Sequence, residues 1–105
     1  MKMSKTLEDA FNSQISEEFY ASFNYLQMAV YCEDKHLTGL ASWLRRQSAE
    51  EHVHAMKFFD HMLARGNRVT LQAIPKPKEE YNSVLEVFEQ ALIQEKRVTE
   101  LIRNL

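Results

Sequence analysis

The positions of its helix breakers constrain this chain more than any other feature. Only two of the 105 residues are glycine and two are proline, and these are Gly39, Gly66, Pro75 and Pro77. Neither type occurs before Gly39 or after Pro77, and the apolar residues there recur every three or four positions. Such stretches are typical of amphipathic α-helices. The sequence therefore predicts an all-α fold in a single domain over residues 1–105.

The pattern predicts three long helices, at about residues 7–35, 39–65 and 83–105. Thr6 and Asp9 resemble a capping pair at the start of the first helix. The second helix is predicted to stop at Gly66, because glycine readily takes the left-handed conformation that ends helices. Ser83 and Glu86 form a capping box at the start of the third.

The connections between these helices predict their arrangement. The first two are joined by a short turn and must be antiparallel. Residues 66–82 hold both prolines and lack periodicity, so they read as a long crossover on the surface. A short turn followed by a long crossover is the pattern of a four-helix bundle with one crossover. Three helices leave that bundle one helix short, which either residues absent here or a second chain must supply.

Composition limits the partners and the compartment. The net charge is −2 with both signs mixed along the chain, which argues against nucleic acid as a partner. The single Cys32 cannot form an internal disulfide, and the N-terminus has no apolar segment typical of a signal peptide. No apolar run approaches the roughly 18 residues of a membrane span. We therefore expect a cytoplasmic protein without a membrane partner.

Each predicted helix carries one glutamate within its apolar stripe. The stripes are Leu7, Phe11, Ile15, Ser22, Tyr25 and Ala29 around Glu18; Leu40, Leu44, Ala55, Phe58 and Met62 around Glu51; and Val84, Phe88, Leu92, Thr99 and Ile102 around Glu95. An ionised carboxylate buried alone costs several kcal/mol, so three would cancel a stability of roughly 5–15 kcal/mol. The lysines and arginines project away from the stripes, so a metal ion is the predicted counter-charge.

His54 supports a metal site because it lies three residues after Glu51, where both side chains can reach one ion. Carboxylates with a single imidazole suit a redox-active metal such as iron better than a closed tetrahedral zinc site. The same Glu-x-x-His spacing also occurs on solvated helix faces, and Glu33 with His36 at a helix end is interpreted in that way.

Three segments of the sequence, together with the crossover, resemble a known protein family. They are "EEFYASFNYLQMAVYCEDK", "GLASWLRRQSAEEHVHAMKFFDHMLARG" and "LEVFEQALIQE". Through them the chain resembles the N-terminal part of a prokaryotic non-haem ferritin, a bacterial ferritin. The resemblance implies a ferritin-like four-helix bundle and a ferroxidase that oxidises Fe(II) to Fe(III) with O2 or peroxide at a di-iron centre. It also implies iron storage or detoxification and, for a complete subunit, a 24-subunit homo-oligomeric shell.

The resemblance assigns roles to individual residues. Glu18 and His54 correspond to terminal ligands of the first iron, Glu51 to the bridging carboxylate, and Glu95 to a ligand of the second iron. Tyr25 corresponds to the tyrosine beside the di-iron centre, where it can donate an electron or a hydrogen bond. A core tyrosine with a satisfied hydroxyl would give the same pattern.

Two more positions are interpreted from the resemblance. Glu50 corresponds to the glutamate through which prokaryotic ferritins hold a third iron, although an exposed helix glutamate fits equally well. His52 stands where bacterioferritins carry the methionine that binds haem, which argues against haem.

A ferritin subunit goes on to complete the third helix, of which this sequence matches the start, and then adds a fourth helix with further second-iron ligands. We therefore expect this chain not to be a stable monomer, because its apolar stripes would face water. We expect either a natural or engineered fragment of a ferritin, whose remaining helices are missing or supplied by another polypeptide, or a symmetric dimer resembling the encapsulated ferritins. In that dimer each chain donates Glu18, Glu51 and His54. A metal-free helical assembly module is the third alternative.

Overall fold

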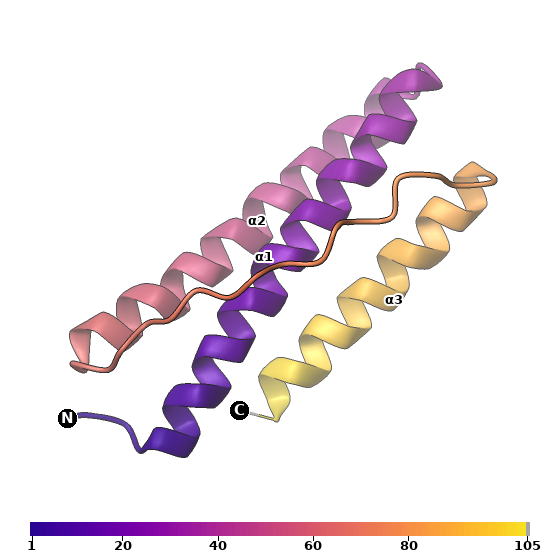
Figure 1. Cartoon of the computed structure of the whole chain (residues 1–105). Helices are drawn as coiled ribbons and strands as arrows, with labels where there is room; N and C mark the ends of the chain where they lie inside the picture. Colours follow the sequence, from indigo (N-terminus) through magenta and orange to yellow (C-terminus); the bar gives the residue numbers. More distant parts are fainter. Residues whose placement is uncertain (105) are drawn as a thin grey trace.

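The computed structural model describes residues 1–104. These residues form three helices and no strand: α1 (Lys5–Asp34), α2 (Thr38–Ala64) and α3 (Val84–Arg103) (Figure 1). The all-α prediction is confirmed, and the helix bounds lie within two residues of the predicted ones. Leu105, predicted as the last helical residue, lies outside the described residues. None of the helices within residues 1–104 has the length and hydropathy needed to cross a bilayer.

Serine side chains cap two of the helices. The prediction that α1 starts at Thr6 is wrong: its N-cap is Ser4, whose hydroxyl accepts a 3.2 Å hydrogen bond from the N–H of Leu7. Because the Ser4 hydroxyl accepts from the otherwise unpaired N–H of Leu7, the helix begins at Lys5, two residues before the predicted start. At α3, the Ser83 hydroxyl accepts a 3.2 Å bond from the N–H of Glu86, as the capping box predicts.

Left-handed residues end both α1 and α2. Gly66 has φ 73°, which confirms the predicted stop, and His36 has φ 60° at the corresponding position after α1. Gly66 has no side chain that would clash in this left-handed conformation, whereas His36 adopts it at a steric cost. The N–H of Leu37 donates to the carbonyl of Cys32 at 2.9 Å, and an equivalent 3.0 Å bond closes α2. Both helices therefore end in the same hydrogen-bonded motif.

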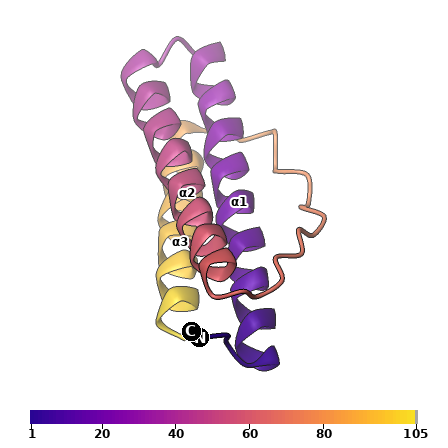
Figure 2. The same cartoon turned by 90° about the vertical axis from the view of Figure 1, so that its left-hand side faces the viewer.

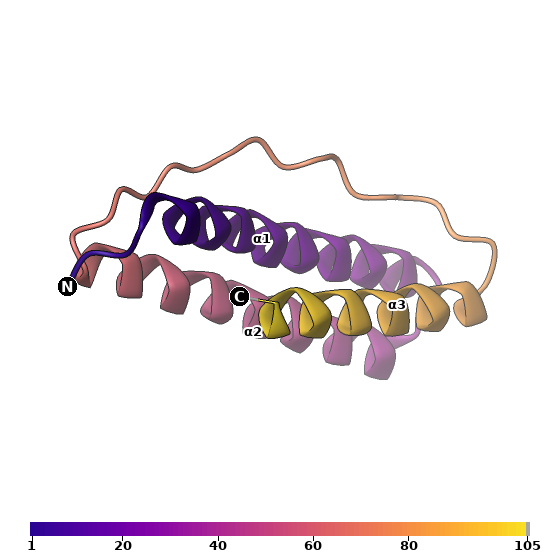
Figure 3. The same ribbon diagram turned by 90° about the horizontal axis from the view of Figure 1, so that it is seen from below.

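The three helices form an incomplete bundle. α2 runs antiparallel to α1, and α3 runs parallel to α2, because residues 65–83 cross the length of the molecule between them. Figures 2 and 3 show this crossover on the outer side of α1, away from α2 and α3. Among the described residues, the α3 backbone approaches α1 but not α2. α1 is therefore the central helix, and it contacts every other element.

Two polar residues of α1 hold the beginning of the crossover. The Glu8 carboxylate accepts hydrogen bonds from the N–H of Arg68 at 2.9 Å and from the Asn67 amide at 3.1 Å. Asn12 donates to the carbonyl of Arg68 at 3.0 Å and accepts from the N–H of Thr70 at 2.9 Å. The Arg68 bond, with help from Asn67, lowers the pKa of Glu8 to about 2. The crossover is thus fixed to α1 where it leaves α2.

The core lies between α1 and the other two helices. Its buried cluster comprises Tyr25, Met28, Ala29, Cys32, Ala41, Leu44, Val87 and Ala91. The buried positions of α3 are Val87, Ala91, Gln94 and Val98. The stripe predicted for this helix is therefore wrong: Phe88 is 45% exposed and Leu92 is 70% exposed. α3 turns its small residues toward α1, since they allow close approach, and leaves its larger apolar residues uncovered by residues 1–104.

Candidate metal centre

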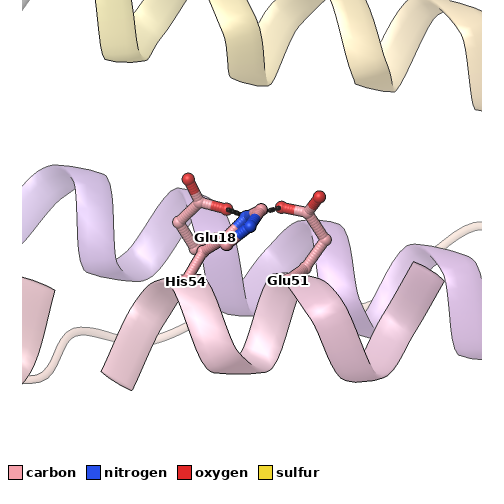
Figure 4. A group of neighbouring side chains, drawn as sticks. All are labelled: Glu18, Glu51 and His54. Atoms are coloured by element: carbon pink, nitrogen blue, oxygen red, sulfur yellow. Dashed lines mark ion pairs between the residues drawn. The ribbon is translucent and has the colours of Figure 1, made fainter. Parts of the chain in front are cut away.

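Three side chains with metal-binding atoms converge between α1 and α2. Glu18 comes from α1, whereas Glu51 and His54 come from α2, and all three point toward the side on which α3 runs (Figure 4). One ligand atom from each lies within 4.8 Å of the others. His54 Nδ1 is 3.7 Å from Glu18 Oε2 and 3.7 Å from Glu51 Oε2. The structure therefore brings together three of the five metal ligands predicted from sequence.

A close helix contact beside the group sets its geometry. The Ser22 hydroxyl donates to the carbonyl of Ser48 at 2.8 Å, and the Ser48 hydroxyl donates to the carbonyl of Ser22 at 2.8 Å. Ser22 lies about one turn after Glu18, and Ser48 lies about one turn before Glu51. The reciprocal bonds therefore hold the two helices together next to the two carboxylates. Sequence reasoning missed Ser48, although its spacing from Glu51 places it on the same face.

The converging atoms are buried and lack partners. Glu18 Oε2, Glu51 Oε2 and His54 Nδ1 form no hydrogen bond with any residue in the described range 1–104. Glu18 is fully buried and Glu51 is 3% exposed. The other oxygen of Glu18 accepts a 3.1 Å bond from the Gln14 amide, which orients the carboxylate and which sequence reasoning missed. Unpaired buried acceptors aimed at one point are unfavourable alone, and they fit a cation.

The electrostatics of the group also fit a cation. Burial is the main cause that raises the pKa of Glu51 to about 9, and the adjacent Glu18 adds to it, followed by the charges of Glu95 and Glu50. Within residues 1–104, every ion pair of a lysine or arginine goes to another carboxylate. Glu51 therefore holds a proton at neutral pH in the absence of metal, and a divalent ion would replace that proton.

Tyr25 and Glu95 lie together but outside this three-residue group. Glu95, half-buried on α3, accepts a hydrogen bond from the hydroxyl of the fully buried Tyr25. Burial, reinforced by this bond, raises the pKa of Tyr25, so the phenol remains protonated. Gln94 anchors α3 here by donating to the carbonyl of Ala21 at 3.1 Å. Sequence reasoning missed Gln94. The only indication in the sequence was that it directly precedes Glu95.

Two other predicted positions lie on the surface. Glu50 is exposed on α2, and only its charge acts on the buried group, through the raised pKa of Glu51. His52 is also exposed, and its ring lies 5.6 Å from the ring of Phe19, measured between centroids. Neither side chain belongs to the converging group of Glu18, Glu51 and His54.

Comparisons with known proteins agree on one family. A family model described as a ferritin-like domain matches residues 8–105. The bacterial non-heme ferritin of Staphylococcus saprophyticus is 42% identical over 103 residues, which are 98% of this chain and 62% of that protein. The bacterial non-heme ferritin of Staphylococcus aureus is 35% identical over the same shares.

Solved structures give the same result. An engineered closed form of the Archaeoglobus fulgidus ferritin superposes with a TM-score of 0.94 at 40% identity, covering 98% of this chain and 63% of that chain. A humanized archaeal ferritin gives a TM-score of 0.94 at 41% identity, covering 98% and 62%. The chain spans less than two thirds of the relatives that it matches. On the family match, the helix arrangement and the placement of the acidic residues, this chain belongs to the ferritin family.

Proposed function

We propose that this chain takes part in ferritin-type iron storage or detoxification by binding Fe(II) as a substrate at Glu18, Glu51 and His54. The observation that carries the proposal is the convergence of three buried, unpartnered ligand atoms from two helices within 4.8 Å. Two carboxylates and one imidazole form a donor set that suits a first-row divalent metal with open coordination positions. Membership of the ferritin family supports iron as that metal.

The proposed activity is that of a ferroxidase. Two Fe(II) ions each lose one electron, and O2 takes up both electrons and two protons to give H2O2. Glu18 and His54 would hold one ion, and Glu51, after giving up its proton, would supply a carboxylate to both ions. Hard carboxylate oxygens favour the Fe(III) product.

The remaining ligands are also part of this proposal. We assign Glu95 to the second ion of a di-iron centre and the exposed Glu50 to a third ion. The charges of both residues contribute to the raised pKa of Glu51, which supports their proximity to the group. Tyr25 is assigned to the neighbourhood of the second ion because its hydroxyl donates to Glu95.

The proposed assembly is a homo-oligomer in the cytoplasm, with a 24-subunit shell as the form typical of the family. Large apolar side chains that residues 1–104 leave uncovered support association; on α3 they include Leu85, Leu92 and Ile93. A symmetric dimer is the second candidate. It is favoured by one observation: the ligand atoms of Glu18, Glu51 and His54 converge without Glu95.

The test is an anaerobic Fe(II) titration followed by air, read by the absorbance of Fe(III), with sedimentation velocity on the same sample. Glu18→Gln should abolish saturable binding. Glu17→Gln is the matched control, because Glu17 is the neighbouring α1 glutamate and pairs with Arg97 at 3.1 Å instead. Two irons per chain support the di-iron centre, and two per dimer support the symmetric candidate. Equal, non-saturable binding by wild type and Glu18→Gln would refute the proposal.

A further inference from the structure

A small cavity lies between α1, α3 and the end of the crossover. Its volume is about 150 Å³, which in proteins is enough to hold a benzene-sized molecule. Lys78 and Tyr81 form one side of it, where the crossover approaches α3 (Figure 1). Glu18, Glu51 and His54 do not line it. The cavity is therefore a feature of the fold that the proposed iron site does not use.

The walls of the cavity are apolar and aromatic. Met28 of α1 is buried, Val98 of α3 is 7% exposed, and the ring of Tyr81 comes from the crossover. Tyr81 is held in place because its hydroxyl donates to the carbonyl of Lys78 at 3.2 Å and its ring packs edge-on against Tyr31. Binding sites for small molecules are mostly apolar, with a few polar groups that fix orientation. The walls therefore suit a flat apolar ring.

Two cations and one carboxylate also line the cavity. Arg97 donates from Nε and Nη2 to the two oxygens of Glu17, at 3.3 and 3.1 Å. Lys78 pairs at 2.5 Å with Glu86, which lies outside the lining. The lining therefore carries a surplus of one positive charge, which a ligand with a single negative charge complements.

The hydrogen-bonding capacity that remains beside these charges consists of donors. Both oxygens of Glu17 already accept from Arg97. Within residues 1–104, Nη1 of Arg97 has no acceptor, and neither has the hydroxyl of the half-buried Tyr20. Glu17 is the main cause that raises the pKa of Arg97, and Tyr20 adds to it, which supports the proximity of the phenol to the guanidinium. A carboxylate accepts from such donors in strong, charge-assisted hydrogen bonds.

We propose that this cavity binds a small aromatic monocarboxylate, of which benzoate is the simplest. Its ring packs against Met28, Val98 and Tyr81. Its carboxylate accepts hydrogen bonds from Arg97 and Tyr20. The bound molecule contacts α1, α3 and the crossover at once, so it also strengthens the attachment of α3, whose backbone approaches α1 but not α2 among the described residues. The inference is independent of the proposed iron-binding function.

Methyl NMR of the full chain tests the proposal. The methionine methyl groups are labelled with 13C, and the protein is titrated with benzoate. Of the five methionines, all within residues 1–104, only Met28 lines the cavity, so the other four signals are internal controls. Met28→Leu identifies its signal. Benzyl alcohol, benzylamine and acetate are titrated in parallel, because they lack the charge, reverse the charge and lack the ring, respectively. No iron is added.

Two pairs of variants test the polar contacts. Arg97→Gln is matched with Arg103→Gln, because both arginines are exposed on α3 and only Arg97 lines the cavity. Tyr20→Phe is matched with Tyr31→Phe, because both tyrosines are half-buried on α1 and only Tyr20 lines the cavity. Circular dichroism verifies that each variant is folded.

Benzoate should shift the Met28 signal saturably, with a Kd of about 1 mM or below. Arg97→Gln should weaken binding at least about tenfold, and Tyr20→Phe at least about threefold. Arg103→Gln and Tyr31→Phe should leave the affinity unchanged. The other three molecules should bind at least about tenfold more weakly than benzoate. The proposal is wrong if Met28 shows no saturable shift up to about 20 mM benzoate, if another methionine shifts more, or if Arg97→Gln or any of the three molecules equals the reference.

Discussion

Replacing Glu51 with glutamine should stabilise the metal-free protein at alkaline pH. Glu51 is 3% exposed, and burial together with Glu18 raises its pKa to about 9. Glutamine has nearly the same shape and carries no charge, so it removes the cost of ionising this position. The groups that face Glu51 are Glu18 on α1, His54 and Glu50 on α2, and Glu95 on α3. In the variant, Glu18 retains its bond from Gln14 and loses its closest like charge.

The sign of the effect follows from the direction of the pKa shift. The unfolded chain loses the Glu51 proton near its ordinary pKa of 4.5, whereas the folded chain keeps it until about pH 9. Between these values unfolding releases a proton, so the free energy of unfolding falls as the pH rises. One proton gives a slope of about 1.4 kcal/mol per pH unit, or about 2.7 kcal/mol from pH 6 to pH 8. Glu51→Gln should lose most of this slope.

Urea unfolding followed by circular dichroism measures this slope. The protein is held with a chelator at one fixed concentration, because association also contributes to apparent stability. Glu50→Gln is the matched control: the neighbouring glutamate is exposed, so its variant should keep the slope of the wild type.

Two results would refute the reasoning. A wild type whose stability does not change between pH 6 and pH 8 would mean that Glu51 ionises freely. A variant less stable than wild type at pH 8 would mean that the ionised carboxylate has a stabilising partner. In either case the group would not be a pair of buried carboxylates lacking a counter-charge.

Three further predictions concern the fold. Glu8→Gln should loosen the start of the crossover. The pKa of Glu8 in the folded protein, about 2, lies below its ordinary value of 4.5. Glu8 therefore contributes to folding stability above pH 4.5, and this contribution is lost as the pH falls toward 2. Amide hydrogen exchange should show faster exchange in the first crossover residues at pH 7. His36→Gly should raise the free energy of unfolding by about 1 kcal/mol, and Gly66→Ala should lower it by about 1 kcal/mol, because φ is 60° and 73° at these positions. A Cβ at Gly66 would meet no atom within 4 Å, so the loss expected for Gly66→Ala comes from the backbone alone. A loss in the free energy of unfolding well above that value, measured by urea unfolding, would contradict this explanation. Ser22→Ala and Ser48→Ala should each cost about 1 kcal/mol, and a double-mutant cycle should find them coupled, since their bonds are reciprocal.

The sequence predicted most of the helical architecture. Helix breakers at four positions limited the chain to three long helices, and the Ser83 cap and the Gly66 stop followed from local hydrogen bonding and backbone sterics. The start of α1 was misplaced at Thr6, because the cap is Ser4, two residues earlier, and the folded structure was needed to show it. The fixation of the crossover by Glu8 was beyond local reasoning, since its partners are about 60 residues away.

The site was predictable as far as helical periodicity extends. Glu51 and His54 share a face of one helix, and their spacing alone places them together. Glu18 could be placed beside these two residues because its own helix has one strongly apolar face and is connected to the following helix by a short turn. The environment of Glu95 could not be predicted in this way, because the side of α3 that meets α1 depends on tertiary packing.

The sequence by itself determined the helices, the short turn, the long crossover and the identity of the residues able to bind metal. These depend on interactions between neighbours along the chain, which periodicity records. Only the tertiary structure decided that α3 buries Val87 and Ala91 instead of Phe88 and Leu92, and that Tyr25 lies between Glu95 and Trp43. α3 carries apolar residues on two faces, so its own pattern leaves the choice open. Close packing against α1 makes that choice, because small side chains let the two backbones approach.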